Sequence, residues 1–316
     1  MFSRLLLIFL LAPVGCKRIE TSPDQQGETT PIVRLHLAAK KGDLEVIESL
    51  IAQGCGVDAR EKDGHTPLYT AALYGQTTVA EFLVSKSADV NAKTLSGKTA
   101  LHAASEGGYV DVAKLLIAAG ADVNAGKEEG RTPLYERPTF NRRTIVEMLL
   151  ANGAEIARGN TPENEELLRF AVGTGLRDLA EKLLSGGTDA DTLDVQDDGM
   201  SSLGRAVVRA DKEMAMLLIT HGADVDRKDA NGNTPLHYAT SLNREVAELL
   251  LANGADVNAG NPLMLAVERG DKPIVELFLA HGADANVRGL DGNTALDEAI
   301  LRGHADIAEI LRAHRN

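Results

Sequence analysis

The sequence predicts an all-α repeat solenoid, in which short helix pairs stack along one axis. The main observation is an internal repeat: residues 63–92 (DGHTPLYTAALYGQTTVAEFLVSKSADVNA) and 96–125 (SGKTALHAASEGGYVDVAKLLIAAGADVNA) share one pattern, with Thr66 and Thr99 lying 33 residues apart. A fixed period in this range is typical of stacked repeats. The composition agrees, because Trp is absent, aromatic residues make up 3 %, and Ala, Leu and Val supply the apolar positions. Such a composition suits thin, closely packed helix pairs.

Each repeat carries signals for two helices and a turn. Thr66 is predicted to cap the first helix, and Pro67 suits its first turn. Gly75 allows the left-handed turn that ends this helix. Val79 and Leu83 stand at helical spacing, which predicts one buried stripe on the second helix. The segment ADVN and the Asp-Gly after it predict a hairpin finger with a tight turn.

The motifs TPLY, TALH and TPLH, the small pair AA, the LL pairs and GADVN resemble the ankyrin repeat, and the resemblance covers residues 32–316. It implies a helix-turn-helix stack with β-hairpin fingers at right angles to the helices. About nine repeats are expected, the last with a polar outer face. Their expected bounds are 32–62, 63–95, 96–128, 129–161, 162–197, 198–230, 231–259, 260–290 and 291–316.

Three repeats depart from the pattern. In repeat four, Arg137-Pro138 replaces the small pair, and Pro138 is expected to break or kink the first helix. Repeat five is expected to lack both the hairpin and the Thr-Pro start, and repeat eight to lack the hairpin. The acidic loop 186–199 (GGTDADTLDVQDDG) departs from the spacing of calcium-binding loops, so a solvated, disordered loop is expected there.

The N-terminal segment predicts export. Residues 1–16 (MFSRLLLIFLLAPVGC) have the layout of a signal peptide, and their apolar run is shorter than the roughly 20 residues of a spanning helix. The end PVGC resembles a bacterial lipobox, although Pro13 stands where Leu is usual, and this implies lipidation of Cys16. Residues 17–31 (KRIETSPDQQGETTP) are predicted to form a disordered tether. We therefore expect a lipoprotein facing the periplasm, with Lys17 favouring the outer membrane; a secreted soluble form and an uncleaved leader are the alternatives.

Charge and motifs narrow the class of partner. The formal net charge of −13 repels nucleic acid and anionic lipid headgroups. No nucleophile elbow, Cys–His constellation or paired carboxylates indicate an enzyme, and we expect no cofactor and no metal.

His36, His102 and His237 share one repeat position, and the resemblance implies that they bond the backbone of the neighbouring loop. Cys55 is expected to be a small buried residue.

The resemblance implies a monomeric, non-enzymatic module that binds another protein through its fingertips and the exposed face of its first helices. Tyr69 and Tyr135 are expected to be packed, whereas aromatic residues and Arg are favoured at binding hot spots. An exposed patch of Tyr74, Arg131 and Phe140 is therefore predicted. The alternatives are an architectural or self-associating spacer, or an enzyme in the irregular region 155–200. The full set of predicted partner-binding residues is Lys62, His65, Leu73, Tyr74, Lys98, Glu106, Arg131 and Phe140.

Overall fold

The structure, a computed structural model, describes residues 30–127, 130–136, 141–194, 198–240, 243–289 and 291–314. These residues form nine successive helix pairs, which confirms the predicted all-α repeat solenoid. The chain divides into two compact units, an N-terminal body that ends at Glu155 and a C-terminal body that begins at Ile156. Each body is a stack of repeats in its own right.

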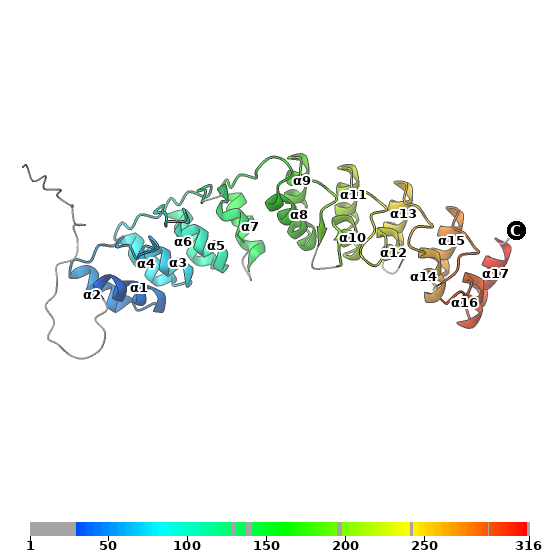
Figure 1. Cartoon of the computed structure of the whole chain (residues 1–316), viewed down its shortest axis with the longest axis horizontal. Coiled ribbons are helices and arrows are strands. Elements are labelled where there is room, and N and C mark those ends of the chain that lie inside the picture. Colours follow the sequence, from blue (N-terminus) through cyan, green and yellow to red (C-terminus); the bar gives the residue numbers. More distant parts are fainter. Residues whose placement is uncertain are drawn as a thin grey trace, which may run out of the picture. The chain divides into compact units, whose positions relative to one another are not determined.

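The N-terminal body holds repeats one to four. The first helices α1, α3 and α5 lie side by side, and the second helices α2, α4, α6 and α7 form the adjacent row (Figure 1). In repeat four a single turn of 3₁₀ helix, η2, replaces the first helix, and Pro138 lies outside the described residues. The bounds are α1 Pro31–Lys41, α2 Leu44–Ala52, α3 Pro67–Leu73, α4 Thr77–Ser85, α5 Ala100–Gly107, α6 Val110–Ala118, η2 Pro133–Tyr135 and α7 Arg142–Ala151.

The C-terminal body holds repeats five to nine, and its helices also form two rows (Figure 1). Its first helices are α8, α10, α12, α14 and α16, and its second helices are α9, α11, α13, α15 and α17. The bounds are α8 Pro162–Thr174, α9 Arg177–Ser185, β1 Leu193–Asp194, β2 Met200–Ser201, α10 Ser202–Val208, α11 Lys212–Thr220, α12 Pro235–Ala239, α13 Arg244–Ala252, α14 Pro262–Arg269, α15 Lys272–Ala280, α16 Ala295–Leu301 and α17 Ala305–Ala313.

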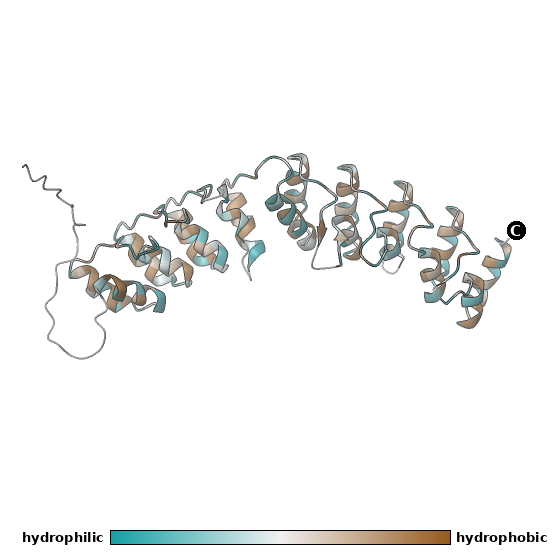
Figure 2. Cartoon of the chain, in the orientation of Figure 1, coloured by the Kyte–Doolittle hydropathy of each residue, from teal (hydrophilic) through white to brown (hydrophobic). Residues whose placement is uncertain are grey.

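The core consists of small and aliphatic side chains between the two rows. Hydrophobic and hydrophilic residues alternate around the helices (Figure 2), and the buried ones recur at fixed repeat positions. Leu68 of repeat two and Leu101 of repeat three occupy the same repeat position, and both are fully buried. The small pair Ala71–Ala72 of repeat two is fully buried as well. Cys55 is also buried, in agreement with its predicted role. The small residues let neighbouring helices approach closely, so each repeat completes the core of the next.

Repeat five begins differently from the prediction. Thr161 caps α8, because its hydroxyl accepts a hydrogen bond from the N–H of Asn164 (3.2 Å), and Pro162 follows in the first turn. The expectation that this repeat lacks a Thr-Pro start is therefore wrong. The described part of the acidic loop is also more ordered than expected, because Leu193 in β1 pairs antiparallel with Ser201 in β2.

The fingers are tight turns that share one hydrogen-bond pattern. In the first, the N–H of Glu61 donates to the carbonyl of His65, and the N–H of Gly64 donates back to the carbonyl of Glu61. Gly64 has a positive φ of 77°, which explains the Asp-Gly signal in the sequence. The same turn joins Thr94 to Lys98, Lys127 to Arg131, Asp229 to Asn233 and Gly289 to Asn293.

The segment ADVN links each finger to the next. The side-chain amide of Asn91 donates to the carbonyl of Gly120 (3.1 Å), and its oxygen accepts from the N–H of Asp122 (2.8 Å). Asn124 and Asn258 make the same pair of bonds to the repeats that follow them. These bonds satisfy backbone groups that the loops leave unpaired, so they position the fingers relative to the helices.

Candidate protein-binding surface

The recurring histidines bond the loops that follow their helix pairs. Nε2 of His36 bonds the carbonyl of Ala59 (2.8 Å), Nε2 of His102 bonds that of Arg131 (3.2 Å), and Nδ1 of His237 bonds that of Gly260 (3.0 Å). The predicted bonds to the neighbouring loop are thus confirmed. Burial lowers the pKa of His36 and of His102. Both imidazoles are therefore neutral at neutral pH, and each can donate one N–H while accepting at the other nitrogen.

The predicted aromatic contact, Tyr74, lies at the end of α3 and is 41 % exposed. Its ring is covered on one side by the ammonium group of Lys40, which lies 4.7 Å from the ring centroid. This cation–π contact stabilises the position of the ring, and much of the side chain remains exposed to solvent. Tyr69, at the start of the same helix, is packed as predicted, with His65 stacked on it at 4.5 Å between ring centroids.

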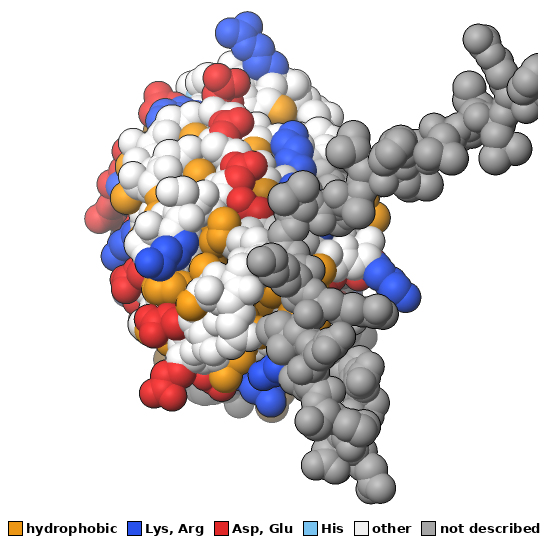
Figure 3. Space-filling view, turned by 90° about the vertical axis from the view of Figure 1, so that its left-hand side faces the viewer, with side chains coloured by type: hydrophobic (Ala, Val, Ile, Leu, Met, Phe, Trp, Pro, Cys, Tyr) orange, Lys and Arg blue, Asp and Glu red, His pale blue; other side chains and the backbone are white. Residues whose placement is uncertain are grey.

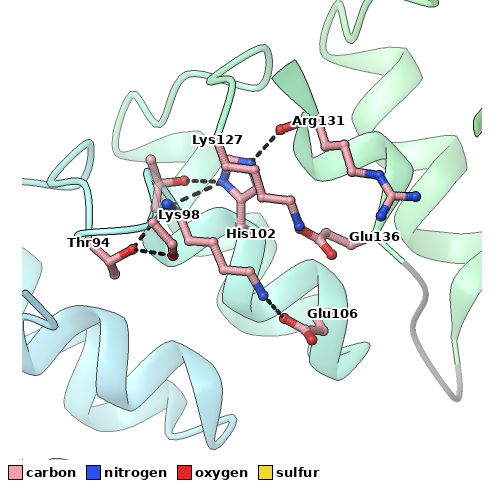
Figure 4. Close-up of polar contacts among 9 residues, drawn as sticks. Thr94, Lys98, His102, Glu106, Lys127, Arg131 and Glu136 are labelled. Atoms are coloured by element: carbon pink, nitrogen blue, oxygen red, sulfur yellow. Dashed lines mark hydrogen bonds and ion pairs between the residues drawn. The ribbon is translucent and has the colours of Figure 1, made fainter. Parts of the chain in front are cut away.

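Two lysine–glutamate pairs extend this surface across repeats three and four (Figure 4). Nζ of Lys98 lies 2.6 Å from Oε2 of Glu106, and Nζ of Lys127 lies 2.7 Å from Oε1 of Glu136. The first pair is half-exposed, whereas the side chains of Lys127 and Glu136 are only 14 % and 8 % exposed. We call these four residues the paired-charge cluster.

The two pairs act on one another electrostatically. Burial lowers the pKa of Lys98, but its hydrogen bond with Glu106 and the charges of Glu136 and Glu106 outweigh burial, so the pKa of Lys98 lies above its ordinary value. Burial also raises the pKa of Tyr69, on which the charges of Lys98, Glu106 and Glu136 act as well. The charges of the two ion pairs therefore interact with each other across the surface from α3 to η2. Each charge is held in position by its ion-pair partner.

The remaining predicted residues occupy the edges of this surface. Lys62 is exposed on the first finger, and Leu73 is half-buried beside Tyr74. The half-buried Arg131 accepts the bond from His102 through its carbonyl, while its side chain extends away from the imidazole (Figure 4). Phe140 and Cys16 lie outside the described residues.

The first repeat adds apolar area at the end of the N-terminal body. Among the described residues no helix pair precedes α1, and Val33 and Leu37 on this helix are exposed. Seen from this end, apolar side chains lie between charged ones rather than in a separate patch (Figure 3). Mixed surfaces of this kind are typical of protein–protein interfaces.

Sequence reasoning missed Lys40, Lys127 and Glu136. One signal was available for Glu136: it stands where repeats two and three have the buried residues Thr70 and Ala103, so a carboxylate occupies a packed position. A buried carboxylate requires a partner. Lys127, on the finger that precedes η2, supplies it.

The described residues give no sign of a metal site or a membrane span. No group of three His, Cys, Asp or Glu side chains in the described ranges could hold a metal ion. No helix of the described chain is both long and apolar enough to cross a membrane.

The sequence matches the family description "Ankyrin repeats (3 copies)" over residues 19–94, 35–127, 93–160 and 168–261, and "Ankyrin repeats (many copies)" over residues 250–299. Among curated proteins, no sequence matches the chain. Ankyrin repeats generally mediate protein–protein interaction, and their domains are typically non-enzymatic. Because the matched segments cover most of its length and agree with the nine helix pairs, the chain belongs to the ankyrin-repeat family.

Proposed function

We propose that this protein is an exported, membrane-tethered scaffold that binds a partner protein through the N-terminal body. The observation that carries the proposal is the surface from α3 to η2, where an exposed, fixed aromatic ring lies near two ordered ion pairs. Because these side chains are already held by contacts within the protein, they would lose little conformational entropy when a partner binds. The protein acts as a non-enzymatic monomer in this proposal.

Binding by this surface is tested with a triple substitution. Replacing Tyr74, Arg131 and Phe140 together by Ala should weaken partner capture roughly tenfold or more, because aromatic and Arg side chains dominate interface energies. The measurement is quantitative co-purification from native membranes, followed by titration of the enriched protein.

The matched control is Glu81→Ala with Lys114→Ala, which removes exposed charges from the second helices α4 and α6 of the same body. This variant should capture the partner as the wild type does. Equal capture by the wild type and the triple variant would contradict the proposed site. A dimer in sedimentation of the mature chain would instead favour the self-associating spacer.

The tether is proposed to be a lipid on Cys16. Support comes from the sequence alone: the leader 1–16 ends in Cys, and the polar stretch 17–31 separates it from the first repeat. Cys16→Ala should abolish incorporation of a labelled fatty acid and release the protein from the membrane fraction, because only the thiol can take the lipid. Leu11→Ala is the matched control within the leader. Continued labelling of Cys16→Ala would show that the anchor is elsewhere.

A further inference from the structure

In three repeats of the C-terminal body an arginine stands at the end of the first helix, directly after α10 and α16 and as the last residue of α14. Arg209, Arg269 and Arg302 each stand immediately before the residue of positive φ that terminates α10, α14 or α16. The first helices of this body form one row, so the same repeat position lies on the same side of the row (Figure 1). All three arginines are exposed. They therefore form a basic strip on a protein whose net charge is −13.

The strip is a departure from the repeat pattern. The equivalent positions of repeats one, two, three and five hold Lys41, Tyr74, Gly107 and Thr174. Repeat seven, between repeats six and eight, also has no arginine at residues 240–242. Helix packing does not require arginine there, because the side chain at this position is not buried in the core.

The arginines of repeat six lie across the end of the preceding first helix. The Cδ of Arg205 lies 3.7 Å from the place where a Cβ on Gly173 would stand, and Nη2 of Arg209 lies 3.5 Å from the corresponding place on Gly175. Because both neighbours are glycines, the arginine side chains can approach the backbone of α8. The end of α8 thus supports the guanidinium groups and limits their freedom.

Two arginines of the strip make no ion pair within the part of the chain that the structure describes, although Oδ2 of Asp211 lies near the same end of α8 as Arg209. Arg302 is hydrogen-bonded to Glu298 on its own helix. Neither Arg209 nor Arg269 has an ion-pair partner among the residues that the structure describes. An exposed guanidinium that the fold does not use is available to an external carboxylate, which it can bind through two parallel hydrogen bonds.

Apolar side chains stand beside two of the arginines. Val208, directly before Arg209, is 41 % exposed, and Leu301, directly before Arg302, is also exposed. The strip therefore alternates charge with apolar surface along the row of helices. Arginine is enriched at the hot spots of protein interfaces. Exposed aliphatic area beside it can be covered by an apolar side chain of a partner.

We infer that this strip binds an acidic segment of a protein in which apolar residues separate the carboxylates. Spaced carboxylates match arginines that occur in three of the five repeats, and intervening apolar residues match Val208 and Leu301. A nucleic acid fits less well, because its unbroken phosphate chain would also meet Glu268 and Glu298 on the same row. At physiological ionic strength charges beyond about 8 Å are screened, so most of the net charge of −13 acts only weakly on a ligand at the strip. The inference is independent of the surface on the N-terminal body.

The experiment uses the mature full-length chain and a fluorescently labelled synthetic peptide built from repeats of Glu-Asp-Leu. Anisotropy titrations compare the wild type with Arg209→Glu/Arg269→Glu. The control is Lys182→Glu/Arg244→Glu, which makes the same charge change on the second helices α9 and α13, where both residues are exposed. All substituted side chains are exposed, and thermal melts by circular dichroism verify that each variant is folded.

The strip variant should bind the peptide at least tenfold more weakly, and the control should stay within twofold of the wild type. A peptide with Ser in place of each Leu should also bind more weakly. No binding to the wild type, equal weakening in both double variants, or tighter binding of a single-stranded oligonucleotide of equal charge would overturn the inference. Tyr74→Ala/Arg131→Ala/Phe140→Ala should leave peptide binding unchanged, which separates failure of this strip from failure of the N-terminal surface.

Discussion

Replacing Glu136 by Ala should lower the free energy of unfolding of the N-terminal body by about 3 kcal/mol, because it leaves the ammonium group of Lys127 buried without its partner. The two side chains form an ion pair of 2.7 Å in which both are nearly covered. The loss can be measured by urea denaturation followed by circular dichroism. Hydrogen exchange along α5 and α7 assigns the loss to this body, since repeat arrays open locally.

A matched set of variants separates the charge from the packing. Lys127→Met/Glu136→Ala removes both charges and restores the small residue that repeat three has at this position, Ala103, so it should recover most of the lost stability. Glu106→Ala removes the partner of Lys98 at a half-exposed site and should cost less than about 1 kcal/mol. If Glu136→Ala and Glu106→Ala cost the same, the Lys127–Glu136 pair does not stabilise repeat four.

Much of the fold could be predicted because its signals recur. Thr66 as a cap, Leu68 as a core residue and His102 as a link to the next finger follow from one repeat and hold in others. The Thr-Pro start of repeat five was missed, because the repeat was expected to begin at 162 and Thr161 was assigned to the previous one. An irregular repeat has fewer signals with which to fix its register.

The candidate site could be predicted only in part. The exposure of Tyr74 followed from its repeat position, but its contact with Lys40 joins residues of two different repeats. The pairing of Lys98 with Glu106 spans a finger and a helix, and no periodic pattern indicates it. Contacts between neighbouring repeats depend on side-chain length and direction, whereas the repeat pattern reports only which positions are buried. A repeat pattern can therefore predict which side chains are exposed for binding. It does not show that an exposed side chain such as Tyr74 or Lys98 already contacts another residue of the same protein.

Gly75→Ala should destabilise the N-terminal body by about 3 kcal/mol, for two reasons that add. Gly75 has a φ of +70°, where a side chain costs roughly 1–2 kcal/mol. In addition, a Cβ at this position would lie 2.5 Å from the ring of Tyr109, which packs over the glycine from the next repeat. The clash should cost roughly a further 1–3 kcal/mol, because the ring also lies against Gly107 and cannot move freely. Urea denaturation of the variant measures the sum.

Gly120→Ala isolates the backbone cost, because Gly120 has a φ of +89° and a Cβ there would meet no atom within 4 Å. It should therefore cost only about 1–2 kcal/mol. In a Tyr109→Ala background, Gly75→Ala should fall to the cost of Gly120→Ala; an unchanged cost in both backgrounds would contradict the clash. The same arrangement recurs where Gln76 lies over Gly42 and His304 over Gly270. The glycine that ends each of these first helices thus serves both its own backbone turn and the docking of the next repeat, which is why a single methyl group should affect two repeats at once.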